Sequence, residues 1–467
     1  MTPESTEESP APRSSLPWFR FLWAFALVAS LVISAYAAFR GGYVGPDYNN
    51  HVARMLDRTR LFDFSTADPP IYILIGHGLF RLIGRNNGFP ITLAIVQAAI
   101  NALAIWWFFL YTERRFRSPV VHLALVLFLT FLPVRVIHSV TSGTDWLTIP
   151  AFVLVLVFFD RFRSEETSTA KNAALAGLAL ALGIWSKYSF MALLPAIFVI
   201  FIILWWKRSW SLLRFVAICA LSLVLPSGLV LHDFWQSSRL PNATARTVWI
   251  PKSGSPGQPE MVWKDLFLVK KTDLELFKAP QFFKREPEDG NNYHIGYRAA
   301  HKHSYLALSH MMAFTDTQNL FQDLPIPQSV DRYLIPDFKT RREWKTPWNI
   351  ASVSFGAFWT LLALIGTPWI LLGAIKHLWR NNLEREDVVA FLGTAYFLLL
   401  FLAVPYCMWS ARDGAWTTRL ILVPLIYFFL AGFLLLDRTI VTKWQKMAFV
   451  ILALVLVQCG IEIVVLT

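Results

Sequence analysis

Charged residues are scarce in this chain: Asp, Glu, Lys and Arg make up 16% of its 467 residues, whereas a soluble globular protein has about 25%. Cysteine is scarcer still, since only three are present and none is spaced as in a CxxC or CxxH motif. These two shortages argue against an ordinary soluble domain, a disulfide framework and a zinc site. The sequence also lacks a P-loop, a dinucleotide-binding fingerprint and a nucleophile elbow, so nothing points to a soluble nucleotide donor.

Apolar residues are abundant instead, because hydrophobic types make up 55% of the chain and aromatic residues 15%. About eleven membrane spans would absorb roughly 220 such positions. The composition therefore predicts an all-α polytopic membrane protein with about 11 transmembrane helices. The predicted spans are 18–39, 90–111, 119–137, 145–159, 172–186, 188–206, 212–231, 348–375, 388–406, 418–436 and 447–466.

The net charge of +12 is explained by where the basic residues fall. Fifteen Lys and Arg residues lie on or beside the connections predicted to be inside, and four lie on the short outer connections after the first one. Because cytoplasmic loops are enriched in Lys and Arg, this bias predicts a cytoplasmic N-terminus. We therefore expect membrane lipids as partners and no nucleic acid.

The chain divides into four predicted parts. Residues 1–17 form a polar, disordered cytoplasmic tail, and 18–231 form a transmembrane catalytic region with an amphipathic first outer loop, 40–89. Residues 232–347 are charged at 29 of 116 positions, which is typical of a mixed, water-exposed extracytoplasmic domain. Residues 348–467 are the C-terminal transmembrane helices.

Asp47 is the first candidate catalytic residue. It follows a Gly-Pro pair directly after the first predicted span, at the outer membrane surface. A carboxylate held there can act as a general base toward an acceptor hydroxyl or amine, or can bind a divalent cation. The alternative is that Asp47 is the N-cap of the following helix.

Asp145 is the second candidate, because the predicted topology puts it on the same side of the membrane as Asp47. Two carboxylates at one apolar surface can share a metal ion or divide into a base and an orienting partner. We therefore expect a divalent cation as a possible cofactor, held by Asp47 and Asp145. Asp145 as an N-cap of the fourth span is the alternative.

Three outer basic residues are candidates for binding a donor phosphate: Lys187, Arg412 and Arg419. Lys187 lies between two apolar spans, where a cation is costly unless it reaches the headgroups or meets an anion such as a lipid-linked phosphate. The two arginines suit bidentate contacts with phosphate. For Arg412 the alternative is a surface pair with Asp413.

Taken in order, these motifs resemble the C-type membrane glycosyltransferase superfamily. The shared features are an outer aspartate after the first span, a Pro-Pro segment in the same loop, a second aspartate after the third span, a Ser-Lys-Tyr turn and a large outer domain. The resemblance is to the bacterial branch similar to protein O-mannosyltransferases and the lipid A aminoarabinose transferase. It implies an integral protein of a bacterial inner (plasma) membrane. It implies that Asp47 is the catalytic base or a metal-associated carboxylate, that Asp145 supports it, and that Lys187 and Arg419 neighbour the donor phosphate.

The sequence thus predicts a glycosyltransferase that moves a hexosyl or pentosyl group from a polyprenyl-phosphate donor to a lipid, glycan or protein acceptor on the extracytoplasmic face, with inversion. A transporter or flippase of lipid-linked saccharides is the alternative, although the candidate charges gather at the outer face rather than near the midplane. A membrane scaffold whose outer domain binds a partner is a third possibility.

Overall fold

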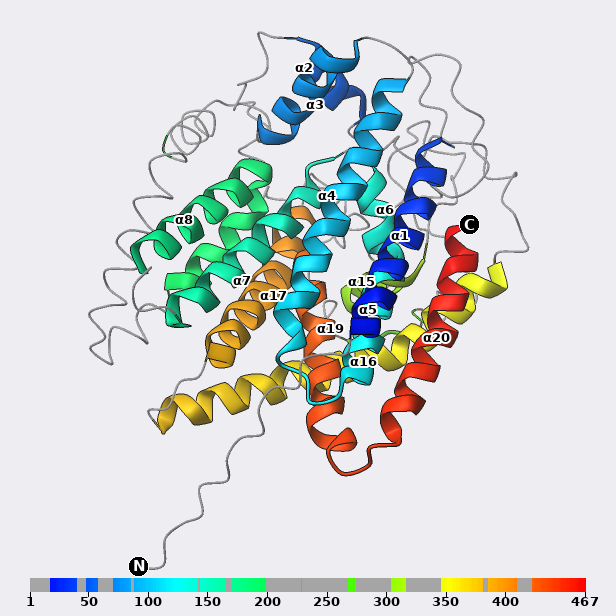
Figure 1. The fold of residues 1–467 in the computed structure, drawn as a ribbon, viewed down its shortest axis with the longest axis vertical. Helices are drawn as coiled ribbons and strands as arrows, with labels where there is room; N and C mark the ends of the chain where they lie inside the picture. Colours follow the sequence, from blue (N-terminus) through cyan, green and yellow to red (C-terminus); the bar gives the residue numbers. More distant parts are fainter. Residues whose placement is uncertain are drawn as a thin grey trace, which may run out of the picture.

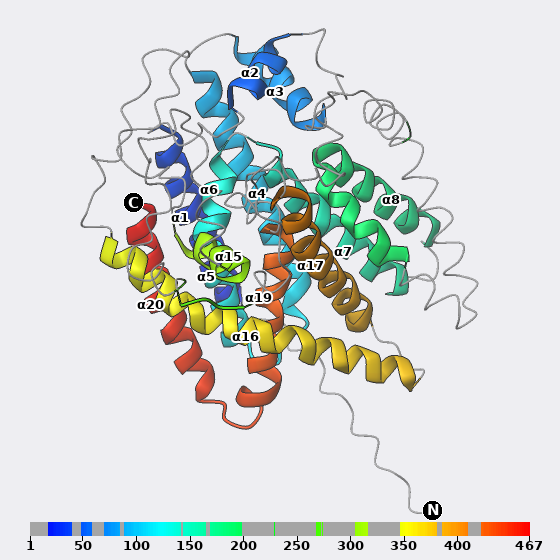
Figure 2. The same cartoon turned by 180° about the vertical axis from the view of Figure 1, so that it is seen from behind.

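The computed structural model describes residues 17–39, 48–57, 70–84, 88–141, 143–164, 169–198, 228, 268–271, 273, 304–315, 346–380, 385–409 and 422–467. Every regular element in these ranges is a helix, which confirms the all-α prediction (Figures 1 and 2). In chain order the elements are α1 (Pro17–Phe39), α2 (Tyr48–Leu56), α3 (Pro70–Ile83), α4 (Gly88–Glu113), α5 (Pro119–Phe131), α6 (Pro133–Val140), η2 (Asp145–Leu147), α7 (Thr148–Ser164), α8 (Thr169–Ser186), η3 (Tyr188–Ala192), α15 (Tyr305–Phe314), α16 (Thr346–Trp379), α17 (Arg385–Trp409), α19 (Leu422–Leu436), η8 (Asp437–Val441) and α20 (Met447–Leu466).

Four of these helices are long and apolar enough to cross a membrane: Pro17–Phe39, Gly88–Glu113, Pro347–His377 and Met447–Leu466. The pair α5 and α6 makes a fifth span if the two are counted together. Shorter apolar helices occupy four further segments, 70–83, 148–158, 170–186 and 390–401. The predicted total of eleven spans stays a prediction, because most of 212–231 and parts of other predicted spans lie outside the described residues.

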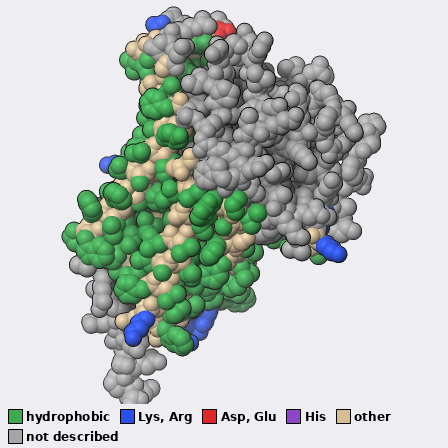
Figure 3. All heavy atoms as spheres, turned by 90° about the vertical axis from the view of Figure 1, so that its right-hand side faces the viewer, with side chains coloured by type: hydrophobic (Ala, Val, Ile, Leu, Met, Phe, Trp, Pro, Cys, Tyr) green, Lys and Arg blue, Asp and Glu red, His purple; other side chains and the backbone are tan. Residues whose placement is uncertain are grey.

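The bundle exposes large apolar side chains on α1, α16 and α20. Phe21 is 71% exposed, and Phe449 and Leu372 are similarly open. Figure 3 shows this side of the molecule as a broad hydrophobic surface with Lys and Arg at its lower margin. A soluble protein rarely exposes so large an apolar surface, whereas contact with lipid accounts for it. The chain is therefore an integral membrane protein.

An aromatic cluster joins distant parts of the sequence at the centre of the bundle. The ring of Phe128 on α5 lies 6.1 Å from Phe314 on α15, 5.5 Å from Trp359 on α16 and 4.9 Å from Phe429 on α19. Ring pairs at such distances stabilise a core beyond their buried area. α15 thus packs among apolar helices although it falls within 232–347. Most of that segment lies outside the described residues, so the extracytoplasmic domain stays a prediction.

The predicted span 119–137 is broken. α5 ends at Phe131, and α6 starts at Pro133 with a bend of 46°. Proline lacks the N–H that continues a helix, and its ring disfavours a helical conformation before it. The buried Arg135 guanidinium donates hydrogen bonds to the Thr130 carbonyl and to Ser30 Oγ on α1. It therefore satisfies a carbonyl near the break and ties the break to α1.

Glycines allow α16 and α19 to approach closely. A Cβ on Gly366 would lie 2.5 Å from the Ala431 carbonyl oxygen, and one on Gly432 would lie 2.9 Å from the Ala363 backbone nitrogen. Small residues of this kind permit close backbone packing between membrane helices. The α16–α19 contact is therefore set by backbone atoms.

Candidate active site

Short helices from the first predicted outer loop cover one end of the bundle (Figures 1 and 2). α2 and α3 pack on each other, on the start of α4 and on η2. Burial of apolar side chains holds this end together. The buried members of the cluster are Met55, Tyr72, Ile73, Phe89, Leu93, Trp146 and Leu147.

The structure places the backbone of Asp145 at this end, as the first residue of η2. The residues beside it, Thr144 and Trp146, are buried, and the ring of Trp146 lies 6.3 Å from that of Tyr72 on α3. η2 also contacts α4, α6 and α8. The helix α2 begins at Tyr48, one residue after Asp47. The elements adjoining the two predicted carboxylates therefore belong to the same apolar cluster.

A chain of polar contacts crosses this cluster. The buried His51 ring on α2 lies edge-on to Tyr72, with centroids 5.3 Å apart. The Tyr72 hydroxyl donates to Gln97 Oε1 on α4 at 3.0 Å, and Gln97 Nε2 donates to the Thr141 carbonyl at 3.2 Å. All three side chains are at most 1% exposed. The contacts thus connect the first loop to the segment that precedes Asp145.

Sequence reasoning missed Tyr72 and Gln97. The available signal for Gln97 was its position as a polar side chain within a long apolar helix, where an unsatisfied amide is costly. It also missed Arg54, which is fully buried on α2 one turn after His51. A buried guanidinium at this end is a further charge that the apolar surroundings must accommodate.

Gln97→Leu is expected to destabilise the protein, because it removes the hydrogen bonds that Gln97 makes to the buried Tyr72 hydroxyl and to the Thr141 carbonyl. Each unsatisfied group costs about 1–3 kcal/mol. A thermal unfolding measurement on purified protein would show a clear drop in midpoint.

Asn101→Leu is the matched control, one turn further along α4. Both amide atoms of Asn101 are buried without a hydrogen bond, so its removal is expected to be neutral or stabilising. Equal losses for the two variants would contradict the assigned role of Gln97.

Lys187 lies between α8 and η3 and is half-buried. Its backbone is extended, and its N–H donates to the Gly183 carbonyl at 2.8 Å, which closes α8. A Cβ on Gly183 would meet the Phe190 ring at 2.2 Å, so glycine permits the close return of the chain after Lys187. α8 contacts α3 and η2, so Lys187 follows a helix that packs on this end of the bundle, although the buried side chains of α8 belong to the central core.

The remaining candidates, Asp47, Arg412 and Arg419, lie outside the described residues, and so does the side chain of Asp145. The assigned roles of all five site residues therefore stay predictions. Among the residues that the structure describes, no three His, Cys, Asp or Glu side chains gather as a metal site. This search does not reach the carboxylates of Asp47 and Asp145, so the divalent cation also stays a prediction.

The fold and this end of the bundle define an integral membrane protein with a buried polar network beneath two short capping helices. Residues 67–229 match the family model for dolichyl-phosphate-mannose-protein mannosyltransferase. The matched region runs from just before α3 to beyond η3, so it includes Asp145 and Lys187 but not Asp47, Arg412 or Arg419. No curated protein matches the chain. The match confirms the resemblance to the C-type membrane glycosyltransferase superfamily, and it supports glycosyl transfer as the class of activity.

Proposed function

We propose that this protein transfers a sugar from a polyprenyl-phosphate carrier to an acceptor on the extracytoplasmic face of a bacterial inner membrane. The family match over 67–229 carries the proposal, because it covers α3, η2 and α8, which contact one another. A polyprenyl-phosphate donor suits an integral membrane enzyme, because the hydrocarbon tail of the donor lies in the same membrane. The acceptor is a lipid, a glycan or a protein.

In the proposed reaction an acceptor oxygen or nitrogen attacks the anomeric carbon as the bond from that carbon to the phosphate oxygen breaks. The Asp47 carboxylate takes the acceptor proton, and the polyprenyl phosphate leaves with the electron pair of the broken bond. A single displacement inverts the anomeric carbon. Asp145 orients the acceptor or Asp47.

Lys187, Arg412 and Arg419 are proposed to stabilise the negative charge that develops on the leaving phosphate. When bound, a divalent cation would add positive charge at the phosphate, with Asp47 and Asp145 as its carboxylate ligands. With or without the cation, the basic residues bind the phosphate, Asp145 orients the acceptor or Asp47, and Asp47 accepts the proton.

The proposed orientation puts the N-terminus in the cytoplasm. The start of α1 and the α4–α5 and α19–α20 connections lie at the end of the bundle away from α2 and α3 (Figure 1). These segments carry exposed basic residues: Arg20, Arg114, Arg117, Lys443 and Lys446. Cytoplasmic connections are enriched in such residues. The candidate active site would then face the extracytoplasmic side.

Sealed vesicles with separated protein orientations test the proposal. Radiolabelled polyprenyl-phosphate mannose serves as the donor probe, and cell-envelope acceptor fractions are added to one side. We expect release of polyprenyl phosphate only when the acceptor is on the side opposite an N-terminal tag. Movement of intact lipid-linked sugar between leaflets without release would replace the proposal by the flippase alternative.

A further inference from the structure

The buried carboxylate of Asp437 links the α4–α5 and α19–α20 connections by hydrogen bonds, at the end of the bundle away from α2 and α3. Asp437, the first residue of η8, accepts hydrogen bonds from the backbone N–H groups of Arg117 at 2.7 Å and Ser118 at 2.9 Å. The Arg117 guanidinium also lies 3.4 Å from Thr442 Oγ1. The α4–α5 and α19–α20 connections therefore form one surface, although they are more than 300 residues apart in sequence.

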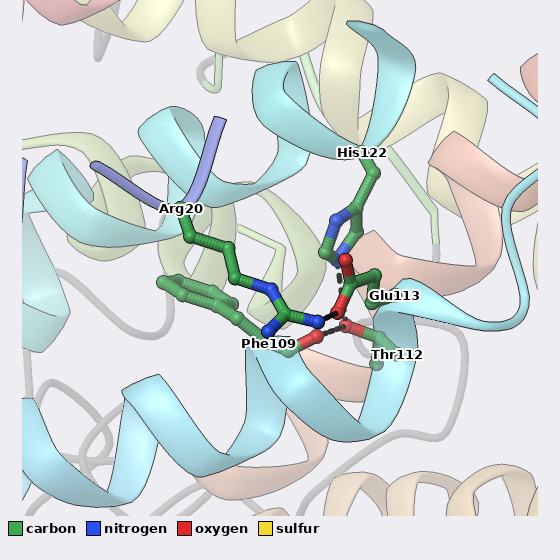
Figure 4. A network of polar contacts seen from close by, with 5 residues as sticks. All are labelled: Arg20, Phe109, Thr112, Glu113 and His122. Atoms are coloured by element: carbon green, nitrogen blue, oxygen red, sulfur yellow. Dashed lines mark hydrogen bonds and ion pairs between the residues drawn. The ribbon is translucent and has the colours of Figure 1, made fainter. Parts of the chain in front are cut away.

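The acidic side chains that the structure describes on and beside these two connections are largely withdrawn from the surface. Asp437 is fully buried by the contacts just described. Glu113 accepts a hydrogen bond from Arg20 at 3.0 Å, and its side chain is 10% exposed. Figure 4 shows this pair beside Thr112 and His122, whose side chains are 3.0 Å apart. The surface charge of the two connections is therefore dominated by cations.

Four exposed cations remain on the two connections: Arg114, Arg117, Lys443 and Lys446. We call these residues the basic patch. Burial raises the pKa of the Asp437 carboxyl, against the opposing effects of the two N–H donors and of Arg438 and Arg117.

The basic patch borders the lipid-facing surface. Trp444, between the two lysines, is 69% exposed, and Trp18 near the start of α1 is 52% exposed. Tryptophan is enriched where membrane helices meet the headgroups. Phe449, just beyond Lys446, is exposed on the apolar face. Cations next to tryptophan and exposed phenylalanine fit a ligand with both an anionic group and a hydrocarbon tail.

We propose that the basic patch binds the phosphodiester headgroups of anionic phospholipids. Arg114 and Arg117 can form bidentate contacts with phosphate, and Lys443 and Lys446 act as point charges. The acyl chains would continue along the apolar face beside Phe449. This inference does not depend on the proposed sugar transfer.

Full-length protein in lipid nanodiscs tests the site, with a short-tailed phosphatidylglycerol titrated into a phosphatidylcholine background. Each surface cation contributes about 1 kcal/mol to binding of anionic lipid, so Lys443→Gln/Lys446→Gln is expected to weaken binding roughly 30-fold. Arg114→Gln/Arg117→Gln is expected to act similarly. Lys376→Gln/Arg380→Gln is the matched control, because it removes two exposed cations from the end of α16. An equal loss in this control would overturn the site.

Asp437→Ala separates a built site from simple net charge. The change removes an acidic side chain, so a charge effect alone predicts binding that is unchanged or tighter. Loss of the hydrogen bonds from Arg117 and Ser118 to Asp437 on η8 predicts weaker binding. Asp437→Asn is expected to be intermediate, because its amide oxygen still accepts one hydrogen bond. Tighter binding by a folded Asp437→Ala would overturn the proposal. If this variant does not fold, the lysine and arginine variants decide the question.

A free-anion control identifies the source of the phosphate. Inorganic phosphate lacks acyl chains, so millimolar concentrations are expected to leave the thermal midpoint unchanged while phosphatidylglycerol raises it. An equal rise with inorganic phosphate would assign the patch to a soluble anion and overturn the lipid assignment.

Discussion

Asp47→Asn is expected to lower kcat for sugar transfer by about 10²- to 10⁴-fold, because general base catalysis contributes a factor of this size. The amide has nearly the shape of the carboxylate but does not accept a proton from the acceptor. The KM for the lipid-linked donor is therefore expected to change little. Steady-state kinetics of purified protein, with circular dichroism as a check of folding, measure this effect.

Asp68→Asn is the matched control for Asp47→Asn, because both aspartates lie in the first predicted outer loop. We expect Asp68→Asn to keep transfer within a few-fold of the wild-type rate. Asp68 precedes the two prolines, and α3 starts at Pro70, so the position of Asp68 suits a structural role at the helix start. Full activity of a folded Asp47→Asn protein would contradict the assignment of Asp47 as base.

Gly366→Val is expected to have the largest effect on stability. Its Cβ would lie 2.5 Å from the carbonyl oxygen and 2.7 Å from the carbonyl carbon of Ala431, so α16 and α19 would have to separate. Overpacking in a core typically costs 1–3 kcal/mol, and contact with backbone atoms allows little relief, so we expect about 3 kcal/mol or more. Thermal unfolding and size-exclusion chromatography in detergent would show a lower midpoint and loss of the monodisperse peak.

Gly373→Val on the same helix is the control. A Cβ at Gly373 would meet nothing within 4 Å. Both substitutions put the same residue into α16, so differences in helix propensity cancel. A Gly373→Val protein that unfolds as readily as Gly366→Val would contradict the packing explanation.

Local sequence signals predicted most of the helices well. The apolar runs behind α1, α4, α16 and α20 are long enough that composition alone locates them. The break at Pro133 was not predicted, because the apolar run 119–137 predicts one span. A proline within a membrane helix can be accommodated by neighbouring groups, as Arg135 does here. An apolar run therefore predicts where a span lies more securely than whether it is straight.

Long-range contacts were not predictable from local patterns. α15 is a short apolar stretch in a charged segment, and nothing in its own residues indicates that Phe314 meets Phe128 and Phe429. The hydrogen bond from the Arg117 N–H to the Asp437 carboxylate depends in the same way on how two distant connections meet. Such contacts follow from the packing of whole helices, which no single sequence window contains.

Of the predicted site residues, the structure describes the backbones of Asp145 and Lys187. The sequence placed Asp145 at a helix start near the membrane surface, and the structure has η2 begin at that residue within the cluster that includes α2 and α3. Tyr72 and Gln97, which connect these segments, were missed because nothing in the sequence shows that the two side chains meet, although Gln97 stands out as a polar residue in an apolar helix. The roles of Asp47, Asp145, Lys187, Arg412 and Arg419 stay predictions.

The most direct test of sugar transfer uses purified protein in detergent micelles, where movement between leaflets has no meaning. Doubly labelled polyprenyl-phosphate mannose is incubated with separate lipid, glycan and peptide acceptor fractions, and free polyprenyl phosphate and mannosylated product are counted. A glycosyltransferase predicts release of one polyprenyl phosphate for each sugar that appears on an acceptor, and a strong loss of both in Asp47→Asn. The contrary result is a folded protein that leaves this donor, and other lipid-linked sugars, intact with every acceptor fraction. That result would contradict sugar transfer as the function.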